Sequence, residues 1–221
     1  NLFSCFCARC RALMSDQDID IAALRQQMTT IAELSKAGEF EPARERFSTE
    51  PLIQRWLAFR QQSVTRLVSE IIRIVGDSQP EAELWLDLWP PSYSWILGQD
   101  YAALTELSPR LKHFPYHRLG GGADVQSLID YFGQDDAQRE RAFATFVRLF
   151  GLDYGQSYAQ FRADGFPIRL VEDQNRMVRE QSRPGTFIYS GIQMWNLPPD
   201  ELRRAAVAAY TSDADDVIYY C

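Results

Sequence analysis

Residues 83–101 read ELWLDLWPPSYSWILGQDY, and their first half predicts a β-strand at 83–89. Successive side chains of a strand point to opposite faces. One face would carry Leu84, Leu86 and Leu88, and the other would carry Trp85, Asp87 and Trp89. The leucine face suits a covering layer of helices. The second face must offer Asp87 a charged partner or water, because burying an unpaired carboxylate is costly.

Predicted helices and strands alternate on both sides of this strand. Apolar spacing predicts helices at 18–36, 50–75, 98–106 and 197–210, and strands at 111–116, 186–194 and 215–220. Residues 122–182 predict several helices, separated at Gly133, Gly151 and Gly165. Thr49 and Pro51 suit the start of the helix at 50–75, and Gly76 suits its end.

Alternation of strands and helices predicts an α/β fold with a parallel sheet. Two architectures fit this pattern, an open doubly wound sheet and a closed (β/α)8 barrel. No GxGxxG fingerprint follows the first strand, so the dinucleotide-binding form lacks its usual marker. The glycine run at 120–122 fits either a turn or a phosphate loop.

Composition excludes two classes of partner. The 221 residues carry a net charge of −7, whereas nonspecific nucleic-acid binding needs a basic face. No run of 18 apolar residues is present, so no membrane span is expected. The sequence begins at Asn1 rather than at a methionine, and it leaves the cellular compartment open.

Aromatic and polar residues gather where the predicted strands end. Such residues suit a sugar, whose C–H face stacks on aromatic rings while its hydroxyls meet hydrogen-bonding groups. The alternative is that the aromatic residues fill the core. The candidate substrate-binding residues are Trp89, Tyr93, Trp95, Gln99, Tyr116, His117, Arg118, Gln193, Trp195 and Tyr219.

Three cysteines near the start form a CxCxxC motif of Cys5, Cys7 and Cys10. Three thiolates could hold a structural zinc ion with His113 or His117 as the fourth ligand. A disulfide within the motif, or reduced thiols in a loop, fits better, because zinc sites usually show two separated pairs of ligands and only one cluster is present. No other cofactor is expected.

Three segments carry a family resemblance: LWLDLWPPSYSWILGQDYAAL, LKHFPYHRLGGGADV and GTFIYSGIQMWNLPPDELRRAAVAAYTSDADDVIYYC. They resemble the later strands of glycoside-hydrolase-like (β/α)8 barrels, and CFCARC resembles a segment that follows the fourth strand in some of them. The resemblance implies a partial barrel, so that 1–221 is a single incomplete domain. Residues 81–221 would form the last four β/α units, and 1–80 the loop and helices after a preceding strand.

The resemblance implies a glycoside hydrolase but supplies no clear catalytic pair. Such enzymes use two carboxyl groups that flank the scissile bond. Related barrels take them from the ends of strands four and seven; here the presumed seventh strand ends in Gln193, and the fourth would precede Asn1. Asp87 and Asp100 are the best catalytic candidates. A noncatalytic carbohydrate-binding or interaction protein on the same scaffold is the alternative.

A half barrel would expose its interior face and two strand edges. The expected partners are therefore a carbohydrate and either the missing half of the barrel or a second copy of the chain. We expect the isolated chain to be unstable or oligomeric. In a third interpretation, the helices at 50–75 and 122–182 mediate assembly.

Overall fold

The computed structural model describes residues 6–118 and 125–220, which form a mixed α/β fold. Its sheet has four parallel strands in the order β1-β2-β3-β4. The strands are β1 (Leu86–Leu88), β2 (Arg110–His113), β3 (Phe187–Gln193) and β4 (Asp216–Tyr220). The predicted parallel α/β arrangement is thus confirmed, although β1 and β2 are shorter than expected.

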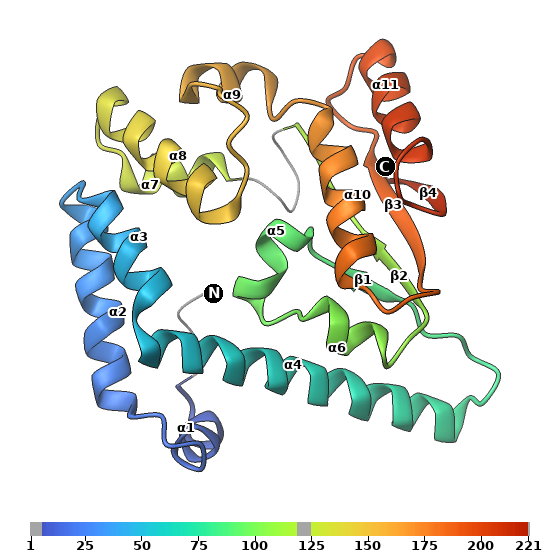
Figure 1. Ribbon diagram of the computed structural model, residues 1–221, viewed down its shortest axis with the longest axis horizontal. Helices are drawn as coiled ribbons and strands as arrows, with labels where there is room; N and C mark the ends of the chain where they lie inside the picture. The colour runs from blue at the N-terminus through green and yellow to red at the C-terminus, as the bar shows by residue number, and fades with distance from the viewer. Residues whose placement is uncertain (1–5, 119–124, 221) are drawn as a thin grey trace.

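Helices precede the sheet and also connect its strands (Figure 1). Before the sheet lie α1 (Ala8–Ser15), α2 (Ile21–Lys36), α3 (Phe40–Thr49) and α4 (Pro51–Ser78). Between β1 and β2 lie α5 (Pro91–Ser94), a 3₁₀ turn (Trp95–Leu97) and α6 (Tyr101–Thr105). Between β2 and β3 lie α7 (Gln126–Phe132), α8 (Asp136–Phe150), α9 (Tyr158–Asp164) and α10 (Arg169–Gln181), and α11 (Pro199–Tyr210) joins β3 to β4.

Helices α6, α10 and α11 cover one face of the sheet. Leu86 and Leu88 are buried there against Leu104 of α6 and Val178 of α10. On strands β3 and β4 of the same face, Ile192 and Val217 pack against the alanines of α11. The leucine side of the first strand therefore meets helices, as its alternation predicted.

The opposite side of the sheet, here called the open face, carries larger and more polar side chains. The strand register places the open-face residues in neighbouring rows. They include Trp85, Asp87, Arg110, Lys112, Phe187, Tyr189, Ile218 and Tyr220. Trp85 stacks on Tyr189 with a centroid separation of 4.6 Å, yet 43% of Trp85 remains exposed. Asp87 also faces away from the helices.

Among the described residues between β2 and β3, glycines end three of the four helices, as predicted. Gly133, Gly151 and Gly165 are the C-caps of α7, α8 and α9. The prediction for Gly76 is wrong, because α4 continues past it to Ser78. A glycine inside a helix costs only about 1 kcal/mol relative to alanine, which the long apolar stripe of α4 can offset.

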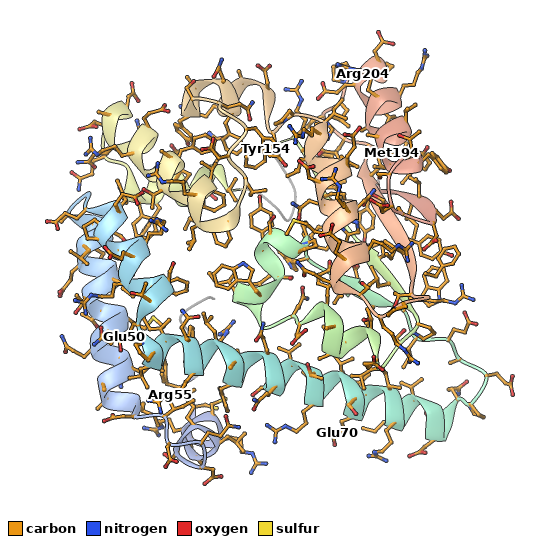
Figure 2. The ribbon with its side chains drawn as sticks, in the orientation of Figure 1. Glu50, Arg55, Glu70, Tyr154, Met194 and Arg204 are labelled. Carbon is orange, nitrogen blue, oxygen red and sulfur yellow. The ribbon has the colours of Figure 1, made fainter. Side chains whose placement is uncertain are left out.

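Helices α1 to α4 share one hydrophobic core, but the sequence predicted only α2 and α4. Helices α1 and α3 were not expected, and Met14 and Phe47 bring them onto the buried Trp56 of α4. The second half of α4 leaves Leu67, Ile71 and Ile74 exposed. These side chains share a stripe with Glu70, which points away from the rest of the molecule (Figure 2).

In the two described ranges, 6–118 and 125–220, no helix is both long and apolar enough to cross a bilayer.

Candidate functional site

Five aromatic side chains meet at the carboxyl edge of the sheet and form what we call the edge cluster. They follow or end the four strands: Trp89, Phe114, Tyr116, Trp195 and Tyr220. Phe114 contacts Trp89 and Tyr116 with ring centroids 5.3 and 5.4 Å apart. Tyr116 continues the contacts to Trp195 at 5.1 Å and to Tyr220 at 6.2 Å. The cluster therefore links all four strand ends.

A cross-strand ion pair lies on the open face beside the edge cluster. Lys112 Nζ donates to Asp87 Oδ2 at 2.9 Å, and the two residues are register partners on β2 and β1. The ammonium group also lies 4.0 Å from the ring centroid of Tyr220. The Asp87 side chain is 55% exposed, so its carboxylate keeps acceptor sites for a ligand hydroxyl.

A second polar group, here called the Glu201 network, fixes the loop after β2 to α11. His117 Nε2 lies 2.9 Å from Glu201 Oε1, and Arg118 donates through Nε and Nη2 to the two Glu201 oxygens at 2.8 and 2.6 Å. Arg118 Nη1 also donates to the carbonyl of Ala163, at 2.9 Å. Gln193 adds a bond to the carbonyl of Trp195, at 3.0 Å, which orients the loop after β3.

The protonation states of this network follow from its contacts. Hydrogen bonds from Arg118 hold the pKa of Glu201 below its ordinary value, so Glu201 is ionised at neutral pH. Burial lowers the pKa of His117, against the opposing hydrogen bond to Glu201. A neutral His117 must donate through Nε2–H, because an ionised carboxylate only accepts. All the groups of the network are thus engaged in holding the loop.

The sequence interpretation missed Glu201, although the residue carries a readable signal. It lies four positions before Ala205, and seven and eight before Ala208 and Ala209, all of which are buried. A glutamate on the apolar stripe of a helix needs a partner from another element. Its two partners, His117 and Arg118, had been assigned to substrate binding.

Gly165 holds the same loop from the α9 side. Its φ is +71°, and Phe166 N donates to the carbonyl of His117 at 2.6 Å. A Cβ at position 165 would lie 2.2 Å from His117 O and 2.8 Å from Arg118 Cα. Only glycine fits this approach.

We expect Gly165→Ala to lower the free energy of unfolding by about 3 kcal/mol, from backbone strain plus displacement of the His117–Arg118 backbone. Urea unfolding measures the change. Gly185→Ala is the matched control, since Gly185 also has a positive φ of +86° but no atom within 4 Å of the added Cβ. Equal losses for the two variants would contradict the role of the contact.

Three of the loop residues predicted to bind sugar make packing or backbone contacts within the fold; Tyr93 is buried, whereas Trp95 and Gln99 are partly buried. Tyr93 is buried against Phe146 and Phe150. Trp95 packs on Phe47 and Phe150, and its Nε1 donates to Ser92 O at 2.8 Å. Gln99 accepts a bond from Trp89 N at 2.8 Å, which positions the backbone beneath the edge cluster.

Two further predicted residues lie away from the edge cluster. Asp100 is the N-cap of α6, where its Oδ1 accepts from Ala103 N at 3.2 Å. Tyr219 pairs in register with Ile192, so it belongs to the helix-covered face, where it is 45% exposed. Its neighbour Tyr220 occupies the open face.

A buried polar chain lies under the helices. Asn175 Nδ2 donates to Ser212 Oγ at 2.7 Å, so Asn175 Oδ1 accepts from His113 Nε2 at 2.6 Å. His113 Nδ1 is buried without a hydrogen-bond partner among the described residues. Burial lowers the pKa of His113 to about 4.

The zinc prediction remains untested. Cys5 lies outside the described residues, and so does the glycine run at 120–122. Cys7 is the N-cap of α1, where its Sγ accepts from Cys10 N at 3.5 Å. The two proposed histidine ligands contact Asn175 and Glu201 instead. Within residues 6–118 and 125–220 no three side chains of the metal-ligating types gather into a site.

Comparisons of the chain with protein families, with curated proteins and with solved structures give no match.

Proposed function

We propose that this protein binds a carbohydrate at the carboxyl edge of its sheet. The observation that carries the proposal is the edge cluster, a continuous set of aromatic rings that joins the ends of all four strands. In parallel α/β folds, ligands bind at this edge of the sheet. Aromatic rings there offer flat apolar surfaces to the C–H face of a sugar.

Polar groups beside the rings complete the chemistry that a sugar needs. Asp87 can accept from sugar hydroxyls, and Lys112 and the Tyr220 hydroxyl can donate to sugar oxygens. Tyr220 is 40% exposed, so a ligand can reach its ring. Desolvation by burial raises the pKa of Tyr116, which keeps its hydroxyl protonated at physiological pH.

Binding fits the geometry better than hydrolysis does. The two predicted catalytic acids lie on different sides of the sheet: Asp87 is on the open face, while Asp100 caps a helix of the covering layer and lines a groove between α4 and α6. Two carboxyl groups in those places do not flank one glycosidic bond, as either hydrolytic mechanism requires. A glycoside hydrolase remains the alternative, favoured by the exposed carboxylate of Asp87.

The same proposal includes a partial (β/α)8 barrel, in which the open face is part of the interior. It is supported by the consecutive order of the parallel strands and by the restriction of α6, α10 and α11 to one face. In such barrels the side chains of the inner face point to a common axis, and the carboxyl edge forms the mouth.

Ligand-observed NMR with a panel of neutral oligosaccharides tests the proposal. We expect binding by the wild-type chain and a roughly tenfold weaker Kd for Tyr220→Ala, equivalent to loss of about 1.4 kcal/mol of stacking. Tyr219→Ala is the matched control, because its ring lies on the other face of the same strand. Absence of binding across the panel, or equal losses for both variants, would refute the proposal. Release of reducing ends during the titration would instead identify the hydrolase.

A further inference from the structure

The open face and the two outer strands of the sheet lack partners within the described chain. Neither β1 nor β4 has a strand neighbour on its outer side among the described residues. Free edges of this kind pair readily with another strand. The face between them leaves Trp85 and Tyr220 exposed by 43% and 40%.

We propose that a second copy of this chain covers the open face, so that two copies close an eight-stranded parallel barrel. A two-fold axis parallel to the strands would pair β4 of each copy with β1 of the other, in parallel at both seams. A two-fold axis perpendicular to the strands would instead pair β4 with β4 and β1 with β1, and both seams would be antiparallel. We choose the first arrangement because it alone keeps all eight strands parallel, like the four strands within each copy.

The number of strands favours two copies over any other number. Eight parallel strands give an interior that side chains just fill, whereas twelve strands from three copies would leave an open channel. The open face presents the large side chains that such an interior needs, including the stacked Trp85 and Tyr189. A single copy exposes these rings to water, and closure would bury them.

The charges of the open face also fit a second copy. Lys112 pairs with Asp87 at 2.9 Å, and Arg110 pairs with Glu83 at 3.2 Å, so each cation is matched within its own copy. On β4, Asp216 Oδ1 accepts from Val217 N. Two identical faces can approach only if neither carries a strong net charge of one sign. The open face of one copy carries two cations and three carboxylates, so its charges nearly balance.

Closure would also change the candidate sugar site. Because the axis runs along the strands, both carboxyl edges would lie at the same mouth, and two edge clusters would surround one opening. This consequence rests on the proposed sugar binding, whereas the assembly rests only on the half-barrel arrangement of the sheet.

Sedimentation-equilibrium measurements on the full 221-residue chain test the assembly. We expect a discrete species of twice the chain mass of 25.4 kDa. A monomer, or a series of larger aggregates, would overturn the proposal. Failure of sugar binding by an intact dimer would refute the proposed function alone.

Two charge substitutions locate the interface. Ile218→Asp places a carboxylate on the open face of β4 and is expected to weaken dimerisation at least a hundredfold. Leu67→Asp places one on the exposed stripe of α4 and is expected to leave dimerisation unchanged. The reverse result would assign assembly to α4 and overturn the barrel. Circular dichroism checks that both variants fold.

A photocrosslink keeps the test decisive if Ile218→Asp fails to fold. With p-benzoylphenylalanine in place of Trp85, and with mixed heavy and light isotopic chains, we expect links between position 85 of one copy and residues 216–220 of the other. Links confined to single chains, or to α4 of the second copy, would overturn the proposal.

Discussion

Replacing Glu201 with alanine is expected to lower the free energy of unfolding by about 3 kcal/mol. Removing one partner of a buried ion pair usually costs about 3–5 kcal/mol, and this pair is partly exposed. The Glu201 side chain is only 10% exposed, and its oxygens accept from both His117 and Arg118. Without it, the partly buried guanidinium group of Arg118 keeps only a long contact with the exposed carboxylate of Asp164, 4.0 Å from Nη1. Urea unfolding at pH 7 gives the change directly.

A control on the same helix separates the ion pair from helix propensity. Arg203→Ala alters an exposed position of α11 and is expected to change stability by less than about 0.5 kcal/mol. Glu201→Gln should fall between the two, since an amide oxygen still accepts one bond from Arg118 but carries no charge. If Glu201→Ala resembled Arg203→Ala, the network would not be holding the loop after β2.

Stability is expected to fall by about 3 kcal/mol between pH 7 and pH 4 through His113 alone. Its pKa is lowered to about 4 in the folded chain, against 6.5 for an unperturbed histidine. Between these values the unfolded chain binds the proton and the folded chain does not. The contribution of neutral His113 to the free energy of unfolding is therefore fully present above about pH 6.5, and it is lost as the pH falls toward 4. His117 titrates with the same sign, because its pKa is also lowered.

His113→Gln isolates this contribution. An amide at position 113 can still donate to Asn175 Oδ1 but does not titrate, so the variant should be less stable at pH 7 and much less sensitive to pH. The measurement is the free energy of unfolding at half-unit steps from pH 7 to pH 4. A wild-type curve that is flat over this range, or that runs parallel to the variant's curve, would contradict a neutral buried His113.

The alternation of the first strand was predictable because it depends on local geometry. Leu86 and Leu88 are buried and Asp87 is exposed, as a strand between a helical layer and an open face requires. Helix ends at Gly151 and Gly165 were predictable for the same reason, since both C-caps have a positive φ, which favours glycine. The predicted helix end at Gly76 was wrong, because packing along α4 outweighs the low helix propensity of glycine.

The membership of the site was harder to predict, because it depends on contacts between distant segments. Tyr93 and Tyr116 both follow strands, but only the tertiary fold sends the first into the α8 core and the second to the edge cluster. Tyr219 and Tyr220 differ by one position, and the register decides which ring reaches the open face. His117 and Glu201 are 84 residues apart, so no local pattern joins them.

A bound sugar can be located by its effect on the aromatic NMR signals of the protein. NMR titration with an oligosaccharide from the panel is predicted to shift the ring signals of Trp195 and Tyr220 while those of Tyr219 and the buried Trp56 stay unchanged. A separate apolar cavity of about 170 Å³, lined by Phe40, Phe47 and Phe146, offers the competing location. Shifts centred on that cavity, with the edge-cluster rings unperturbed, would contradict the account.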